Sequence, residues 1–123
     1  GPTNEVAMLG LYGQRCGVEV EIEFDGSTFS HDECHREPAS LERVGGGERD
    51  DTGGWHDAGD YGKYVVNGAF AVAFLLQAFE HTPAVVRALE VPIPERGNDV
   101  PDVLDEARVE IEWILKTQFD DGS

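Results

Sequence analysis

The segment 61–81 constrains the fold of this chain more than any other part of the sequence. Its apolar residues recur at helical spacing and fall on nearly every side of the predicted helix, interrupted by Asn67, Gly68 and Gln77. A helix that is apolar all round has no face for water and must be covered by several neighbours. We therefore predict an all-α fold in which 61–81 is a helix buried on every side.

The rest of the sequence predicts too few partners for that helix. Apolar spacing predicts a short helix over 4–15 and a longer one that starts at Pro101, a residue tolerated at a first helical position. Residues 18–24 alternate apolar and acidic side chains, which predicts a strand or an extended loop with one face in water. We therefore expect the chain to be a piece of a larger helical domain.

A long stretch without periodicity, residues 25–60, precedes the apolar helix. It is rich in Gly, Ser, Asp, Glu and His, with runs of glycine at 45–47 and 53–54. A structureless stretch of this length inside a compact domain is uncommon and is usually a functional loop. We expect something other than ordinary secondary structure to hold it in place.

The chain carries a large excess of acid, with 25 Asp and Glu against 9 Lys and Arg and a formal net charge of −16. Such a surface repels phosphate backbones and argues against a nucleic-acid partner. No apolar run reaches the roughly 18 residues of a membrane span, so no membrane partner is expected.

Acid excess with only two lysines indicates either a halophilic protein or an ordinary acidic soluble domain. Melting temperatures in low and in multimolar salt distinguish these two.

The sharpest chemical signal is Gly-Gly-Trp-His-Asp-Ala-Gly-Asp-Tyr-Gly-Lys-Tyr at 53–64. Asp57 and Asp60 lie close together where the loop reaches the helix. Two such carboxylates can hold a water molecule between them, as a general base for attack by water requires. The alternative is a helix cap, in which Asp60 accepts a backbone N–H and Asp57 is merely solvated.

Aromatic residues surround the two aspartates. Trp55, Tyr61 and Tyr64 supply flat faces against which a sugar ring can stack. We therefore treat these three residues as candidates for substrate binding.

Two cysteines and two histidines form a second candidate site. Cys16, Cys34, His35 and His56 can be read as a tetrahedral zinc set, because two thiolates and two imidazoles are a familiar structural combination. A metal here would fix the loop and the neighbouring aspartates. The alternative is a Cys16–Cys34 disulfide with two solvated histidines. His31 lies nearby, and we interpret it as structural or solvent-exposed.

The 53–64 motif resembles the sequence signature of glycoside hydrolase family 9, which contains many endoglucanases. Further matches follow in the family's order: Leu-Tyr-Gly-Gln-Arg-Cys-Gly at 11–17, Phe-Ser-His at 29–31, Cys-His at 34–35, Val-Pro-Asp-Val-Leu-Asp-Glu-Ala-Arg at 100–108 and Glu-Trp-Ile-Leu-Lys-Thr-Gln at 112–118. The resemblance covers almost the whole chain.

The resemblance implies an (α/α)6 barrel, of which residues 1–123 would be the N-terminal portion of the catalytic domain. Its implied chemistry is hydrolysis of β-1,4-glucosidic bonds in cellulose or related β-glucans, with inversion. By position, Asp60 would be the catalytic base and Asp57 its partner in holding the attacking water. The general acid would be a Glu near the end of the domain, which nothing in this chain matches. We therefore expect this chain alone to be inactive, and the rest of the barrel and a β-glucan to be its partners.

The resemblance also favours zinc over the disulfide. A subgroup of the family binds zinc through two cysteines, a histidine directly after the second, and a histidine just before the first catalytic aspartate. Cys16, Cys34, His35 and His56 follow that arrangement. Calcium elsewhere in the full domain and a secreted location are further expectations. Nothing at the N-terminus reads as a signal peptide, but Gly1-Pro2 looks like a tag-cleavage scar, so a natural signal could have been removed.

Two other functions remain compatible with the same residues. An exo-β-glucosaminidase of the same family would share the aspartates and prefer amino sugars. A non-catalytic carbohydrate-binding module stabilised by zinc would have the same fold and would bind carbohydrate without hydrolysing it.

Overall fold

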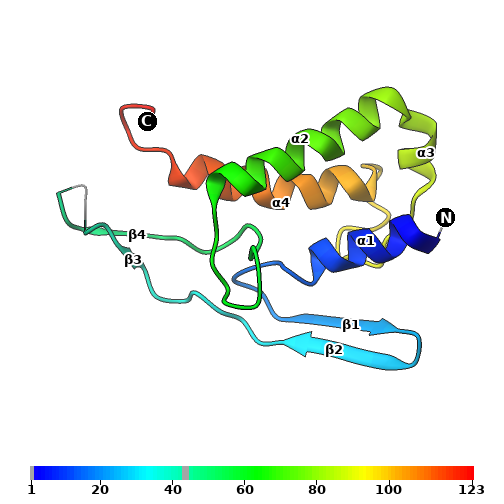
Figure 1. Cartoon of the computed structure of the whole chain (residues 1–123), viewed down its shortest axis with the longest axis horizontal. Helices are drawn as coiled ribbons and strands as arrows, with labels where there is room; N and C mark the ends of the chain where they lie inside the picture. The colour runs from blue at the N-terminus through cyan, green and yellow to red at the C-terminus, as the bar shows by residue number, and fades with distance from the viewer. Residues whose placement is uncertain (1, 43–44) are drawn as a thin grey trace.

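The computed structural model describes residues 2–42 and 45–123. Its body is a group of helices in which α2 runs along α4, α3 packs against α2, and α1 contacts α4 (Figure 1). The helices are α1 (Pro2–Tyr12), α2 (Val65–His81), α3 (Pro83–Ala88) and α4 (Asp102–Thr117). Within the described ranges, no helix is both long and apolar enough to cross a bilayer.

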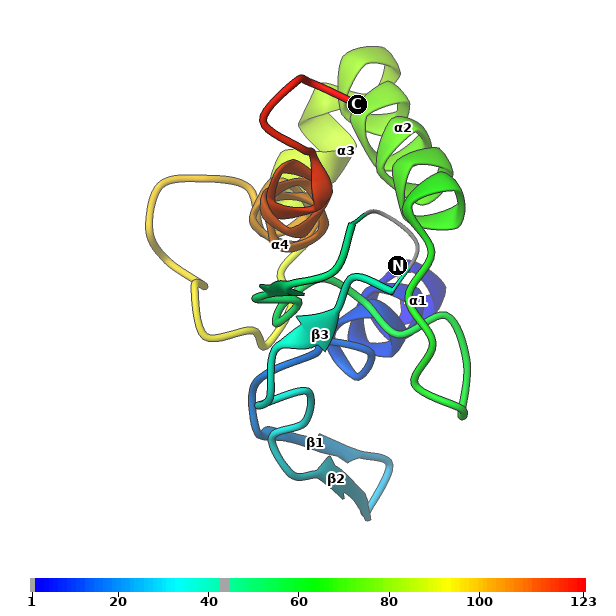
Figure 2. The same ribbon diagram turned by 90° about the vertical axis from the view of Figure 1, so that its left-hand side faces the viewer.

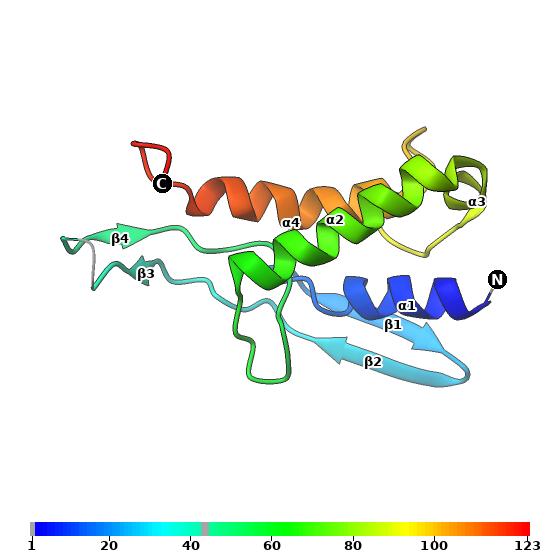
Figure 3. The same cartoon turned by 45° about the horizontal axis from the view of Figure 1, so that its top comes forward.

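Two antiparallel hairpins accompany the helices, so the all-α prediction is only partly correct. β1 (Val20–Phe24) pairs with β2 (Ser27–His31), and β3 (Ala39–Ser40) pairs with β4 (Glu48–Arg49). The first hairpin extends beneath α1 and the second projects beyond the opposite end of the body (Figure 3). The first turn is Asp25-Gly26, and both residues have positive φ, which suits the right-handed twist of a hairpin.

The core lies where α1, α3, α4 and β1 meet. In the strand, Val20 is fully buried and Ile22 packs against the same cluster, so the predicted alternation of 18–24 serves to bury one face. The buried members of the cluster are Met8, Tyr12, Val20, Val86, Val91, Ile93 and Val103. In Figure 2, which looks along α4, α3 lies against this helix, α1 lies lower, and β1 runs below α1.

The prediction that the apolar helix is buried on every side is wrong for this chain. Val72 is the one buried residue of α2, whereas Val66 is 80% exposed and Phe70 is 66% exposed. The reason is that α2 packs against α3 and α4 among the described residues, which leaves its remaining sides in solvent. The apolar pattern correctly indicates a need for neighbours that this chain does not supply.

Gly68 sets how closely α2 approaches α4. An ideal Cβ at this position would lie 1.7 Å from Glu110 Oε1, and the Trp55 backbone N–H holds the Glu110 carboxylate at 2.6 Å. A Gly68→Ala chain must therefore separate the helices or displace a buried carboxylate. Overpacking of this kind costs about 1–3 kcal/mol. We expect the free energy of unfolding, measured by urea denaturation, to fall by that amount.

The matched control is Gly10→Ala in α1, where an added Cβ meets no atom within 4 Å. Alanine favours a helix over glycine by about 1 kcal/mol, so this change should maintain or raise the free energy of unfolding. Equal unfolding midpoints for the Gly68→Ala and unmodified chains would show that the contact between α2 and α4 is not tight.

Candidate metal centre and active site

Two stretches far apart in the sequence run side by side where α1 ends. The Cys16 backbone N–H donates to the Gly54 carbonyl at 2.8 Å, and the His56 N–H donates to the Gln14 carbonyl at 2.8 Å. These two bonds hold the backbones of Cys16 and His56 next to each other. The side chains of both residues are buried, Cys16 at 2% and His56 at 3% exposure.

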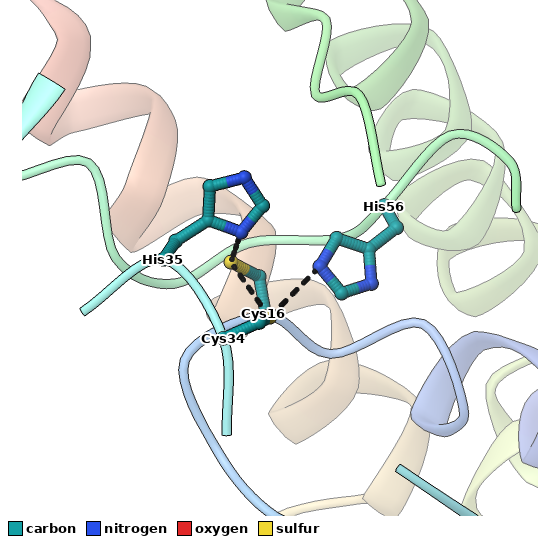
Figure 4. A group of neighbouring side chains, drawn as sticks. All are labelled: Cys16, Cys34, His35 and His56. Carbon is teal, nitrogen blue, oxygen red and sulfur yellow. Dashed lines mark hydrogen bonds between the residues drawn. The ribbon is translucent and has the colours of Figure 1, made fainter. Parts of the chain in front are cut away.

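The loop after β2 brings two more potential ligands to this point. Cys16, Cys34, His35 and His56 each direct one ligand atom into a group whose atoms all lie within 4.8 Å of one another (Figure 4). His35 has a positive φ of 52°. The predicted grouping of these four residues is therefore confirmed.

The sulfur–sulfur distance in the group matches that around a tetrahedral zinc, and the two measured sulfur–nitrogen distances are about 0.4 Å shorter than such a zinc requires. Zinc bonds of about 2.3 Å to sulfur and about 2.05 Å to nitrogen place tetrahedral ligand atoms about 3.8 Å apart for two sulfurs and about 3.6 Å apart for sulfur and nitrogen. The two Sγ atoms are 3.7 Å apart, and the distances from Cys16 Sγ to His35 Nδ1 and from Cys34 Sγ to His56 Nε2 are both 3.2 Å. Both cysteines are free, and their separation far exceeds the roughly 2.05 Å of a disulfide, so the disulfide alternative is wrong.

Burial favours the neutral forms of two of the candidate ligands. Burial lowers the pKa of His56 to about 4, with His35, His31 and Lys63 adding to the effect, so the imidazole is neutral at pH 7 and its lone pair is available. Burial also raises the pKa of the Cys16 thiol, although nearby Lys63 opposes this. Metal binding would therefore displace the thiol proton, as ligation by cysteine requires.

His31 lies beside this group but outside it. Its ring centroid is 5.8 Å from that of His56. Its Nε2 lies 3.2 Å from the Gly13 carbonyl and its Nδ1 lies 2.9 Å from the Asp32 carbonyl. Both ring nitrogens thus face backbone oxygens, which fits the predicted structural role.

Trp55 is held by two carboxylates on successive turns of α4. Its indole Nε1–H donates to Glu106 at 2.7 Å and its backbone N–H donates to Glu110 at 2.6 Å. Trp55 is only 6% exposed, so its position does not fit the sugar-stacking role predicted for it. The residue instead anchors the loop that leads to His56 and Asp57.

The buried charges behind this anchor were not expected from the sequence. Arg15 is 5% exposed and donates to Glu106 at 2.9 Å and to Glu95 at 3.0 Å. Burial raises the pKa of Glu110, which the Trp55 N–H and Lys63 partly offset. A signal was present, because Glu106 and Glu110 lie four residues apart on the helical face that also carries buried Trp113.

Asp57 and Asp60 lie on an exposed turn that closes on itself before α2. The Asp57 backbone N–H donates to the Gly62 carbonyl at 2.7 Å, and the Gly62 N–H donates to Asp60 Oδ1 at 3.0 Å. The Asp57 carboxylate accepts from Asn67 Nδ2 at 2.9 Å, which ties the turn to the first part of α2. Both carboxylates are exposed, and each keeps an oxygen that these bonds do not use.

The helix-cap alternative is wrong for both aspartates. α2 begins at Val65 with Tyr64 as its N-cap, so the helix starts later than predicted. The delay follows from the turn, because Tyr61 has a positive φ of 59° that no helix contains. Asp60 does accept a backbone N–H, but that N–H belongs to the turn.

Tyr61 and Tyr64 remain accessible near the turn, at 44% and 53% exposure. The Tyr61 ring centroid is 4.4 Å from that of His56, so this side chain also covers the metal group. Tyr64 lines a cavity of about 190 Å³ together with Asp57, Asn67 and Glu110. The turn, the cavity and the metal group are therefore contiguous.

The sequence matches the family model of glycosyl hydrolase family 9 over residues 3–123. Endoglucanase D of Acetivibrio thermocellus is 45% identical over 121 residues, which is 97% of this chain and 19% of that protein. Endoglucanase C of Cellulomonas fimi is 53% identical over 137 residues, which is 94% of this chain and 12% of that protein. The chain thus spans less than a fifth of the length of these relatives.

Solved structures agree with these matches. A metagenome-derived glycoside hydrolase family 9 endoglucanase superposes with a TM-score of 0.84 at 40% identity, covering 97% of this chain and 22% of that one. AaCel9A in complex with cellobiose-like isofagomine superposes with a TM-score of 0.82 at 36% identity, covering 95% of this chain and 22% of that one. The motif at 53–64, the order of the elements and the family match agree, and the chain belongs to glycosyl hydrolase family 9.

Proposed function

We propose that this chain is the N-terminal portion of the catalytic domain of an endo-β-1,4-glucanase, and that it carries the base of an inverting hydrolysis. The observation that carries this proposal is the turn at 57–62, which presents two exposed carboxylates between the metal group and α2. The endoglucanase names of its relatives support the substrate class. The substrate would be cellulose or a related β-glucan.

In the proposed reaction, Asp60 removes a proton from a water molecule as the water oxygen attacks the anomeric carbon. Asp57 accepts a second hydrogen bond from that water, and Asn67 holds Asp57 in place. An acid on the opposite face of the sugar protonates the departing glycosidic oxygen, roughly 6.5–9.5 Å from the base in inverting enzymes. We expect another part of the domain to supply this acid.

The metal is proposed to be zinc with a structural role. Two cysteines and two histidines suit zinc, and four protein ligands would leave no open position for a substrate. Cys34 and His35 lie in the loop, Cys16 follows α1 and His56 precedes Asp57, so one ion would fasten the loop, the helix end and the aspartate turn together.

The surroundings of the turn fit a polysaccharide site. The exposed rings of Tyr61 and Tyr64 could stack against sugar rings near the aspartates. The exposed apolar side of α2, including Val66 and Phe70, is where the remaining helices of an (α/α)6 barrel would pack. Secretion is proposed because the substrate is an insoluble polymer outside the cell.

The experiment that tests the function uses a protein with the complete catalytic domain. We expect it to hydrolyse barley β-glucan and to release the α-anomer first, as seen by proton NMR during the reaction. Preference for chitosan oligomers would favour the exo-β-glucosaminidase, and binding of oligosaccharides without turnover would favour the non-catalytic module. Release of the β-anomer would contradict inversion.

A further inference from the structure

The Lys63 side chain is buried beside the metal group, only 3% exposed. A buried ammonium is costly unless its charge and its N–H groups are paired. Its Nζ donates to the backbone carbonyls of Asp51 and Gly53, the latter at 3.1 Å, and lies 5.1 Å from the centroid of the Trp113 ring. The Asp51 carboxylate, at 3.6 Å, balances the charge without a close hydrogen bond.

One donor of this ammonium remains for the metal group. An ammonium has three N–H bonds, and the two carbonyls use two of them. The charge of the Lys63 ammonium also acts on the nearby Cys16 thiol, where it opposes the rise in the pKa that burial causes. The Cys16 backbone is bound to Gly54, next to the Gly53 carbonyl that Lys63 contacts, so the lysine and the thiol are held by the same short loop.

We propose that Lys63 is a positioning residue of the metal centre, which donates an N–H···S hydrogen bond to the metal-bound Cys16 thiolate. This inference rests on the proposed metal site. A thiolate on a divalent ion keeps part of its negative charge, and a buried cation next to it stabilises the charged form. Partners of this kind orient the ligands, and their loss typically weakens metal affinity about 10–100-fold.

The bond also links the metal centre to the aspartate turn. Lys63 follows Asp60 by three residues and fastens the chain between the turn and α2 to the loop at 51–53. The position of Cys16 and the position of the end of the turn therefore both depend on the Lys63 side chain. No other lysine of the chain is placed in this way.

The test compares Lys63→Met with Lys116→Met. Lys116 is the other lysine of the chain and holds the same loop, through the Thr52 carbonyl at 2.7 Å, but it is 38% exposed and reaches no metal ligand. Zinc affinity is measured by competition with a chromophoric chelator, and the thiolate-to-cobalt charge-transfer band is recorded on the cobalt-loaded chain. We expect Lys63→Met to weaken zinc binding about 10–100-fold and to shift the band, and Lys116→Met to change neither.

A third measurement uses the unmodified chain and does not depend on the folding of a variant. In the cadmium-loaded, nitrogen-labelled chain, NMR should detect scalar coupling from cadmium to the Lys63 ammonium across the hydrogen bond, and none to Lys116. Unchanged affinity and band in Lys63→Met, or absence of the coupling, would overturn the inference. If the unmodified chain binds neither zinc nor cobalt, the proposed metal site itself fails, which separates the two failures.

Discussion

A Cys34→Ser chain is expected to lose tight zinc binding and to melt at a much lower temperature than the unmodified chain. Cys34 is one of four ligands, and its Sγ lies 3.7 Å from Cys16 Sγ and 3.2 Å from His56 Nε2. Serine places a hydroxyl where the metal requires a thiolate. The loss should be large, because the proposed metal would tie the loop that carries Cys34 and His35 to the segments that carry Cys16 and His56.

The size of the effect follows from linkage. A ligand present at 1,000 times its dissociation constant stabilises the folded state by about 4 kcal/mol. In a domain of this size, that loss should lower the melting temperature by on the order of 15 °C. Treating the unmodified chain with a strong chelator should lower its melting temperature to that of Cys34→Ser, and should leave Cys34→Ser itself unchanged.

The matched control is His31→Gln. His31 is next to His56 but contacts backbone carbonyls, and glutamine keeps an N–H donor for the Gly13 carbonyl. Metal analysis should find about one equivalent of zinc in the unmodified and His31→Gln chains and less than half an equivalent in Cys34→Ser. Equal zinc contents and melting temperatures in all three chains would show that the four residues do not bind the metal together.

Local patterns of the sequence predict most of the helices, and together with the family resemblance they predict the metal group. Cysteine and histidine side chains are distinctive metal ligands. The spacing of the three segments that carry them is not typical of a zinc site, but the family resemblance assigns all three to one site. Trp55, in contrast, is predicted to bind substrate, because an aromatic residue near two aspartates fits a sugar site. Its burial depends on Glu106 and Glu110, which lie more than fifty residues away in the sequence. Contacts of this range cannot be deduced from local periodicity.

Charged residues in the interior were missed for a related reason. Sequence patterns assign a charge to the surface, yet Arg15, Lys63 and Glu106 are buried together with partners from other segments. Each is stabilised only by the completed fold, because the same side chain alone would be too costly to bury. The second hairpin was missed as well, since strands of two residues are too short to show alternation.

The apolar pattern of α2 correctly indicates that this helix needs neighbours on several sides, but the predicted burial is not found in this chain. Apolar residues on nearly every side predict burial, but Phe70 and Phe74 are 66% and 56% exposed in this chain. Their rings contact each other, with centroids 4.8 Å apart, on the exposed side of the helix. A helix that is apolar on nearly every side thus indicates that further elements pack against it. The relatives are five or more times longer than this chain, long enough to contain those elements.

Replacing Asp60 by asparagine in a protein with the complete catalytic domain should lower kcat on β-glucan about 10²–10⁴-fold, the usual contribution of a general base. Asparagine keeps the oxygen that accepts the Gly62 N–H at 3.0 Å, so the turn should persist and zinc content and melting temperature should not change. KM should change little, because the amide occupies the same volume as the carboxyl group but cannot take a proton from water.

Two further measurements separate loss of the base from loss of the turn. Asp121→Asn is the matched control, because Asp121 Oδ1 accepts the Ser123 N–H at 2.9 Å in a similar turn away from the site. The kcat of this variant should equal that of the unmodified protein.

Azide needs no deprotonation to act as a nucleophile, so it should restore turnover of an activated glucoside in Asp60→Asn and form a glycosyl azide. An Asp60→Asn protein with undiminished kcat would reject Asp60 as the base. A large loss of activity that azide does not relieve would assign Asp60 a structural role. The attack of water would then need another carboxylate as its base. Asp57, which lies on the same turn and accepts a hydrogen bond from Asn67, is the nearest in sequence.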